Sequence, residues 1–240
     1  MHSPNSTTSC HRDATTQIMY QAVYNVSADI GEYIMARPRE FDEDDVLESA
    51  LHVFWDKGYE AASLADLQEA TGLTKSSLYK AFDSKEGLFR RVLERYNRDH
   101  LAFRAVALAQ ATPQLVTEAL LSGTVNLHTG RNTPSGCLVT LSALSCSAEV
   151  RPLSEALSES RNAFERLLRE RFDTIKGAGP LPNGMNSQAA AAFISTFIQG
   201  LAVQAKGGAT RRRLRQIVTA VLAAMWPGEA SRAKQRKAHS

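Results

Sequence analysis

The sequence predicts an all-α protein, and three observations support that fold class. Apolar side chains recur at the three- and four-residue spacing of a helix, as at Val46, Leu47 and Ala50. Loops rich in glycine, proline and polar residues separate these periodic segments, for example at 128–136 and 176–186. The segment from 110 to 226 contains no stretch that reads as a convincing strand. The 240 residues are enough for a sizeable core divided over one or two domains.

The composition excludes several classes of protein. No apolar run is long enough to span a bilayer, and the N-terminus lacks the basic and then apolar regions of a secretory signal. We therefore expect a cytoplasmic protein without a membrane partner. Three cysteines, an odd number, do not suit a disulfide scaffold, and no CxxC or clustered His/Cys spacing indicates a metal site. We expect neither a metal nor a cofactor.

Shifts in composition divide the chain into five parts. A disordered or over-extended N-terminal arm precedes a three-helix head, and one long helix then connects the head to a helical body. The tail is basic and polar. The expected bounds are 1–35 for the arm, 36–83 for the head, 84–109 for the connecting helix, 110–226 for the body and 227–240 for the tail.

A helix, a tight turn and a second helix are expected at 63–82. Ser63 caps the first helix. The apolar face of that helix comprises Leu64, Leu67 and Ala70. Gly72 lies at the turn, where glycine adopts a positive φ without steric cost. Thr74 caps the second helix, and Leu78 points back from it to the core.

The second helix is the candidate DNA-binding element. Its other side chains are mostly polar: Lys75, Ser76, Ser77, Tyr79 and Lys80. Such a face suits a phosphate-lined groove better than a protein core, although an ordinary surface hairpin of helices is the alternative. Residues 40–69 contain ten acidic side chains and one lysine, Lys57. Residues 75–98 contain seven lysines and arginines and only three acidic side chains. The basic run favours DNA contact, and a merely solvated face is its alternative.

The order of motifs around this unit resembles the DNA-binding domain of the tetracycline-repressor (TetR/AcrR) family of bacterial transcription regulators. The resemblance is ungapped from about 41 to 96 and combines F/W-x-x-K-G-Y, A-T-G-L-T, S-x-Y-x-x-F and K-E-x-L. It implies an N-terminal helix-turn-helix head and a C-terminal body for ligand sensing and dimerisation. The implied function is a homodimeric repressor, which a small-molecule effector releases from a palindromic operator in double-stranded DNA.

The resemblance also assigns roles to residues of the head. The residues expected to contact base edges and phosphates are Thr74, Lys75, Ser76 and Ser77. Tyr79 and Lys85 match positions that contact the DNA backbone, and Lys80 is an expected addition. Ser63 lies at a helix N-terminus, where free amides and the helix dipole can hold a phosphate.

The body contains five expected helices, at 113–127, 137–145, 152–175, 187–206 and 211–225. The last two are apolar over more than one face and so require burial on two sides. They suit the core of a monomer; the resemblance instead implies that they pair with their copies in a dimer. Polar candidates for an internal ligand cavity are Thr140, Ser142, Ser145, Gln199 and Gln204. His128 falls in an expected loop, where a solvated side chain is predicted.

Cys137 is a candidate sensor of electrophiles. It follows a glycine at an expected helix start, and a helix N-terminus raises the thiolate fraction of a thiol. The ordered set of G-C-L, Cys146 and Q-A-K resembles an electrophile- and oxidant-sensing branch of the family. In that branch the first cysteine is reactive, and Lys206, if close to it, would favour the thiolate. The alternative is a buried, inert cysteine.

Two other function classes remain open. A non-sequence-specific architectural DNA-binding protein would not need a body of this length. A helical enzyme would need a catalytic motif, and the sequence contains no G-x-S-x-G, P-loop, H-E-x-x-H or glycine-rich dinucleotide loop. We therefore expect no catalytic residues and no enzyme activity.

Overall fold

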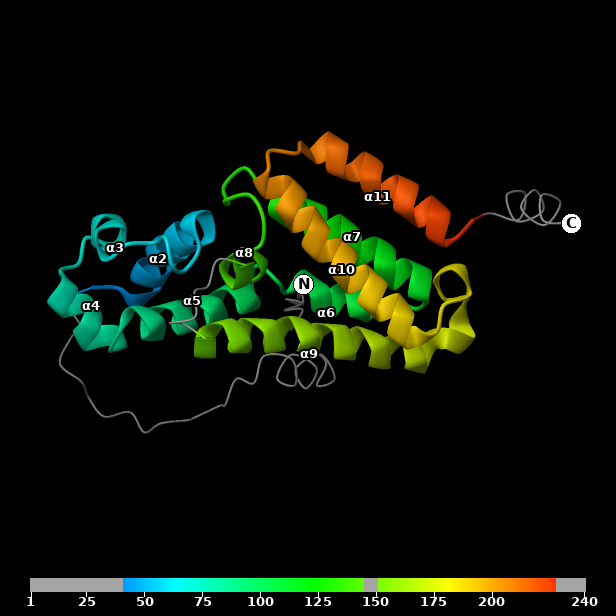
Figure 1. Cartoon of the computed structure of the whole chain (residues 1–240), viewed down its shortest axis with the longest axis horizontal. Helices are drawn as coiled ribbons and strands as arrows, with labels where there is room; N and C mark the ends of the chain where they lie inside the picture. Colours follow the sequence, from blue (N-terminus) through cyan, green and yellow to red (C-terminus); the bar gives the residue numbers. More distant parts are fainter. Residues whose placement is uncertain (1–40, 145–150, 228–240) are drawn as a thin grey trace, which may run out of the picture.

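The computed structural model describes residues 41–144 and 151–227, and throughout these two ranges the regular structure is helical (Figure 1). This confirms the all-α fold class. The expected N-terminal arm, Ser145, Cys146 and nearly all of the basic tail lie outside the described residues. Within the described part of the chain, no helix is both long enough and apolar enough to cross a membrane.

The head consists of three helices, as predicted. They are α2 (Glu43–Lys57), α3 (Leu64–Thr71) and α4 (Lys75–Phe82). Each begins after a residue whose side-chain oxygen accepts a hydrogen bond from a backbone amide of the first turn: Asp42, Ser63 and Thr74. Such caps stabilise a helix start by about 1 kcal/mol each, which matters for helices of only eight residues. Short polar sequence signals therefore define the bounds of the head helices.

The turn between α3 and α4 depends on Gly72. Its φ is 70°, in the left-handed region, and its amide donates to the carbonyl of Gln68. This conformation ends α3 and directs the chain into α4 so that Leu67 and Leu78 meet in the core. Ala70, expected on the apolar face of α3, is exposed instead. The buried face of α3 therefore contains fewer residues than its sequence pattern predicts.

The connection between head and body is two helices, not the single helix expected at 84–109. Helix α5 (Lys85–Asp99) ends at His100, and α6 (Phe103–Leu108) follows after a turn. The turn brings Leu101, only 2% exposed, into the same core as the head. Neither glycine nor proline marks this break in the sequence, and the buried Leu101 lies at it.

The body helices match the expected ranges to within two residues. They are α7 (Pro113–His128), α8 (Leu138–Leu144), α9 (Arg151–Ile175), α10 (Ser187–Lys206) and α11 (Arg211–Met225). Helix α10 packs against α9 and α7, and α11 lies along the outside of α7 (Figure 1). Two 3₁₀ turns, at Lys176–Ala178 and Pro182–Gly184, occupy the loop between α9 and α10.

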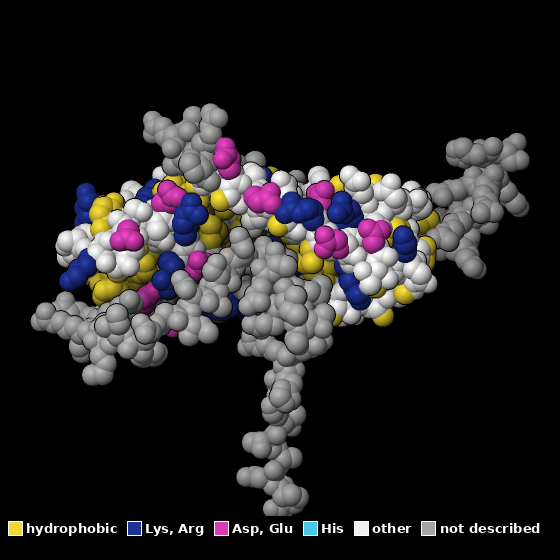
Figure 2. Space-filling model, turned by 90° about the horizontal axis from the view of Figure 1, so that it is seen from below, with side chains coloured by type: hydrophobic (Ala, Val, Ile, Leu, Met, Phe, Trp, Pro, Cys, Tyr) yellow, Lys and Arg dark blue, Asp and Glu magenta, His cyan; other side chains and the backbone are white. Residues whose placement is uncertain are grey.

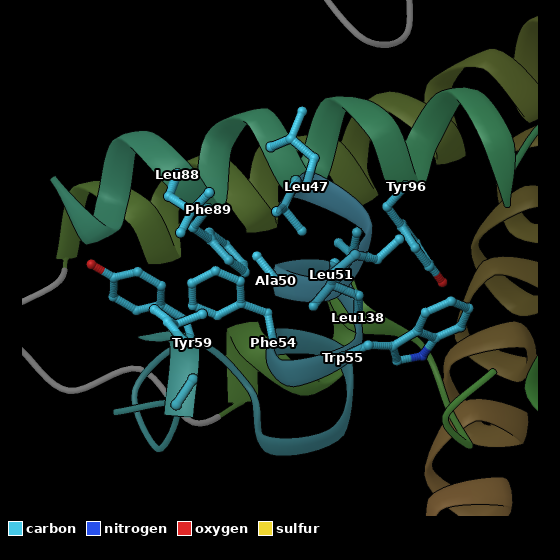
Figure 3. Packing of buried hydrophobic residues seen from close by; sticks show 14 of the residues in the cluster. Leu47, Ala50, Leu51, Phe54, Trp55, Tyr59, Leu88, Phe89, Tyr96 and Leu138 are labelled. Atoms are coloured by element: carbon cyan, nitrogen blue, oxygen red, sulfur yellow. The ribbon is translucent and has the colours of Figure 1, made fainter. Parts of the chain in front are cut away.

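Two hydrophobic cores hold the molecule together. The body core joins α7, α9, α10 and α11. The head core is built mainly from α2 and α5, and it extends into the body through Cys137, Leu138 and Ala202. Figure 3 shows Leu138 packed beside Leu51 and Trp55 of α2. The start of α8 therefore belongs to the packing of the head, and a change there reaches α2 directly.

His128 corrects one expectation from the sequence. It was expected in a loop with a solvated side chain, but it is the last residue of α7 and only 2% exposed. Burial, with a smaller contribution from the charge of Arg104, lowers its pKa from 6.5 to about 4. The imidazole is therefore neutral near pH 7.

Candidate functional site

The start of α4 is organised by a cluster of hydroxyl groups. The Oγ1 atom of Thr74 accepts from the amide of Ser77 at 3.2 Å. The same atom lies 2.9 Å from Oγ of Ser76 and 3.0 Å from Oγ of Ser77. The first turn of α4 is thus held in place by its own side chains.

The outer face of α4 carries polar and cationic groups. Lys75, Ser76, Tyr79 and Lys80 are exposed, Ser77 is half-buried, and Leu78 and Phe82 anchor the inner face. Nζ of Lys75 lies 5.6 Å from the centroid of the Tyr79 ring. Figure 1 places α4 at the end of the molecule farthest from α11, where no other described helix covers it. This face presents donors and positive charge outward, as binding to DNA phosphates and bases requires.

Lys85 lies beside α4 in a half-buried position. Its Nζ donates to the carbonyl of Glu60 at 3.3 Å and lies 4.6 Å from the centroid of the Tyr59 ring. Burial lowers the pKa of Lys85, while the charges of Glu60 and Asp66 oppose that shift. An ammonium has three donors, and this carbonyl uses only one of them. Lys85 is therefore oriented with donors available to a phosphate.

Ser63 is engaged in a capping box, which is more than the single cap expected from the sequence. Its Oγ accepts from the amide of Asp66, whose carboxylate accepts from the amide of Ser63. Lys57 donates to the same carboxylate at 2.7 Å, and these bonds lower the pKa of Asp66 to about 2. The side chain of Ser63 thus holds α3, and an ionised carboxylate lies next to it. The S-x-x-D spacing could have revealed this cap.

Two arginines of the basic run from 75 to 98 pair with acidic residues of α2, so DNA contact along the whole run stays a prediction that these ion pairs do not favour. Arg91 pairs with Glu43 at 2.7 Å, and Arg95 pairs with Asp44 at 2.7 Å and with Glu48 at 2.9 Å. These arginines join α5 to the acidic start of α2. Figure 2, seen from below the view of Figure 1, shows basic and acidic side chains interspersed on that side of the molecule. The cations of α4, together with Lys85, remain as the candidate DNA contacts.

Cys137 lies where the head meets the body. It directly precedes α8, as predicted, and is 4% exposed. The hydroxyl of Tyr96 on α5 donates to its Sγ at 3.5 Å. The Tyr96 ring also meets the ring of Trp55 on α2 edge to face, with centroids 4.8 Å apart. The candidate sensor thiol is therefore in contact with a side chain of the helix that leaves the head.

Gly136, the residue before Cys137, allows the chain to pass close to α8 and α10. Its φ is 91°, and an added Cβ would lie 2.8 Å from Cδ1 of Leu141 and 3.2 Å from the carbonyl oxygen of Ala202. Its own carbonyl accepts from Nε1 of Trp55 at 2.8 Å. The glycine before Cys137 thus has a structural function in joining three helices.

Lys206 lies near this junction, but its ammonium is engaged elsewhere. Nζ donates to the backbone carbonyl of Asp56 at 2.6 Å and to Oδ1 of the same residue at 3.0 Å. It therefore ties α10 to the end of α2. Its expected effect on the Cys137 thiolate stays a prediction, and the bond to Asp56 does not favour it.

A small cavity adjoins Cys137 inside the body. Its volume is about 20 Å³, which is enough for one water molecule. It is lined by Arg104, Cys137, Val139, Thr140, Ser160, Arg161, Phe164, Ser195, Ile198 and Gln199. Of the expected polar candidates, Thr140 and Gln199 line it, whereas Ser142 is buried outside its wall and Gln204 is exposed. The two arginines were not among the residues expected from the sequence.

Comparisons with known proteins agree with this architecture. The family model described as "Bacterial regulatory proteins, tetR family" matches residues 46–92. The transcriptional repressor ComR of Escherichia coli K12 is 35% identical over 194 residues, which cover 80% of this chain and 91% of ComR. The repressor BdcR of the same strain is 29% identical over 178 residues, covering 73% and 84%.

Solved structures extend the comparison to three dimensions. A cysteine mutant of the TetR-family regulator CifR, in complex with 26-base-pair operator DNA, is 42% identical with a TM-score of 0.74. The match covers 80% of this chain and all of the CifR chain. The reduced form of E. coli NemR, at 20% identity and a TM-score of 0.60 over 74% of this chain and 93% of its own, shares the fold. The chain belongs to the TetR family of bacterial regulatory proteins.

Proposed function

We propose that this DNA-binding repressor acts as a homodimer on a palindromic operator and is released when Cys137 is modified or when an effector enters the body. The observation that carries the proposal is the outward face of α4, with Lys75, Tyr79 and Lys80 exposed on a helix anchored by Leu78. ComR and BdcR are named as repressors, and CifR was solved with operator DNA. Neither an architectural protein nor an enzyme is among these relatives.

Dimerisation is supported by the outer face of α10. Phe193 and Val203 are 43% and 47% exposed on this helix. Gly200 lies between them, and a Cβ added there would meet nothing within 4 Å. Exposed apolar residues beside a residue without a side chain suit close packing of the same helix from a second copy. Two copies of α4 would then read two half-sites, because one eight-residue helix contacts too few base pairs to select a genomic site.

Release is proposed to begin at the contact between Cys137 and Tyr96. The Tyr96 hydroxyl donates a hydrogen bond to Sγ of Cys137, so a group added to this sulfur would displace the Tyr96 side chain. Because Tyr96 and Trp55 are packed against each other in α5 and α2, displacement of one ring shifts the helices that position α4. A modified thiol therefore favours a head arrangement that no longer fits successive major grooves.

A gel-shift experiment tests the proposal on DNA from the promoter region of this gene. The wild type, Cys137→Ser and the matched cysteine variant Cys146→Ser are each assayed with and without N-ethylmaleimide. We expect all three to bind, and the reagent to release the wild type and Cys146→Ser but not Cys137→Ser. Absence of a shift with every promoter fragment would refute DNA binding there. Release of Cys137→Ser would refute its role as the sensor.

A different result would identify the second mode of release. If all three proteins bind and none responds to the reagent, the regulator is controlled by an effector that does not react with a thiol. Apolar small molecules would then be screened in the same assay.

A further inference from the structure

The cavity beside Cys137 has an unusual electrostatic character. Two of its lining residues, Arg104 and Arg161, are cationic, and none is acidic. They reach it from α6 and α9, two helices that are far apart in the sequence. A cavity wall that combines two guanidinium groups with hydroxyl and amide side chains is complementary to an anion.

Neither arginine is neutralised by an acid among the residues that the structure describes. Arg104 lies over the ring of Phe164, 4.1 Å from its centroid. Arg161 donates to the hydroxyl of Ser158 at 3.1 Å, a neutral acceptor. By contrast, Arg166 on the same helix pairs with Glu159 at 2.6 Å. Most of the five N–H donors on each cavity arginine therefore stay available to a ligand.

Two buried hydroxyl groups face the same space. Thr140 and Ser195 line the cavity and are 7% and 4% exposed. Each hydroxyl carries one O–H donor, from which a ligand oxygen in the cavity could accept a hydrogen bond.

The charge of Arg104 also acts on the groups around the thiol. It lowers the pKa of His128, and it partly offsets the burial that raises the pKa of Tyr96 well above its ordinary value. Tyr96 is the residue that donates to Cys137. The positive potential of the cavity therefore extends to the atoms next to the reactive sulfur.

We propose that this cavity selects small electrophiles that carry a carboxylate or a similar oxyanion, with Arg104 and Arg161 holding the anion while Cys137 attacks the electrophilic carbon. The inference rests on the proposed role of Cys137 as the sensor thiol, and it names the chemical class of the effector. Because the cavity has a volume of only about 20 Å³, even a small ligand must widen it. Widening moves the start of α8, which is part of the head core.

Iodoacetate and iodoacetamide are a matched pair of probes, because they differ only in the charged group. With either reagent the Cys137 sulfur attacks the methylene carbon, an S–C bond forms, and the C–I bond breaks. Iodide leaves with the bonding electrons, and the thiol proton passes to solvent. Peptide mass spectrometry of the full-length protein gives the alkylation rate at Cys137 for each reagent. The same chain unfolded in urea gives the intrinsic rate ratio of the two reagents.

We expect the iodoacetate-to-iodoacetamide ratio at Cys137 to be about tenfold higher in the folded protein than in the unfolded chain, as one charged hydrogen bond would provide. Arg104→Gln and Arg161→Gln should return the ratio to the unfolded value. Arg161→Lys, which retains the charge, should keep part of the preference. Arg166→Gln, on the same helix but away from the cavity, is the matched control and should leave the ratio unchanged.

Two results would overturn the inference, and they differ in what they say of the sensor. Equal ratios in the folded and unfolded chains, with both reagents reacting, would reject the anion preference and leave Cys137 as a reactive thiol. Failure of both reagents to alkylate Cys137 in the folded protein would reject the anion preference together with the proposed sensor.

Discussion

The DNA-binding face of α4 and the cavity beside Cys137 are built in opposite ways. The α4 face comes from eight consecutive residues, held by a cap at Thr74 and anchored by Leu78. The cavity is assembled from α6, α8, α9 and α10, whose lining residues span almost a hundred positions. A surface of the first kind depends on local sequence, whereas one of the second kind depends on the whole body packing. Mutations should therefore affect the two regions by different routes.

The largest expected effect comes from the anchor of α4. Leu78→Ala removes a side chain that is 2% exposed and should lower the free energy of unfolding by about 2 to 5 kcal/mol. Because the head is small, DNA binding should be lost as well. Leu168→Ala, at a fully buried site of the body core, should cost a similar amount but leave α4 in place. Urea unfolding and gel shift compare the two, and equal loss of DNA binding would show that the regions are not separable.

A pH titration tests the buried His128 at the end of α7. The folded pKa of His128 is about 4 and its ordinary value is 6.5, so between these values the unfolded chain binds a proton that the folded chain does not. The contribution of His128 to the free energy of unfolding is therefore fully present above pH 6.5. It decreases as the pH falls and is about 3 kcal/mol smaller near pH 4. His128→Gln should remove this slope from urea unfolding measured between pH 7 and 4.5. His52→Gln, at an exposed histidine of α2, is the control and should retain it.

The two caps Thr74 and Thr112 permit a closely matched test. Each accepts a hydrogen bond from a first-turn amide, Thr74 at the start of α4 and Thr112 at the start of α7. Either change to Ala should lower the free energy of unfolding by about 1 kcal/mol. Only Thr74→Ala should also weaken operator binding, since it loosens the residues that enter the groove. If Thr112→Ala weakened binding as much in a gel shift, local order at α4 would not be the determinant.

The substitution Lys85→Ala should have the smallest effect of the four, and this effect should be confined to DNA binding. Lys85→Ala should weaken binding equally to all DNA sequences and reduce the slope of log affinity against log salt by about one unit, because one phosphate contact is lost. Lys176→Ala, at an exposed lysine of the body, should leave the slope unchanged. Fluorescence anisotropy with labelled operator at several salt concentrations measures both. An unchanged slope in Lys85→Ala would remove this residue from the DNA interface.

The same contrast explains what could be predicted from the sequence. The caps Ser63 and Thr74 and the turn at Gly72 are local signals, so the bounds of α3 and α4 followed from them. The pairing of Arg91 and Arg95 with α2 joins residues about fifty positions apart, and no local pattern marks it. His128 was assigned to a loop because polar and glycine residues follow it, yet packing extends α7 through it.

The cavity could not be predicted for a related reason. Arg104 and Arg161 occur in amphipathic helices, where an arginine normally belongs to the solvated side. Their convergence depends on how α6 and α9 pack, which is a property of the assembled body. Cys137 was found because the adjacent glycine and the helix start are visible in the sequence, whereas no local pattern marks Tyr96, about forty positions away, as its partner.

The contact between Trp55 and the Cys137 segment has an optical consequence. Trp55 is one of only two tryptophans in the chain; its indole N–H is bonded to the carbonyl of Gly136, and its ring rests on Tyr96. With Trp226 replaced by Phe, the emission of the protein would come from this one indole at the junction of head and body. The repressor thus contains an intrinsic fluorophore at the point through which the proposed signal passes, and stopped-flow emission could time that step without any added label.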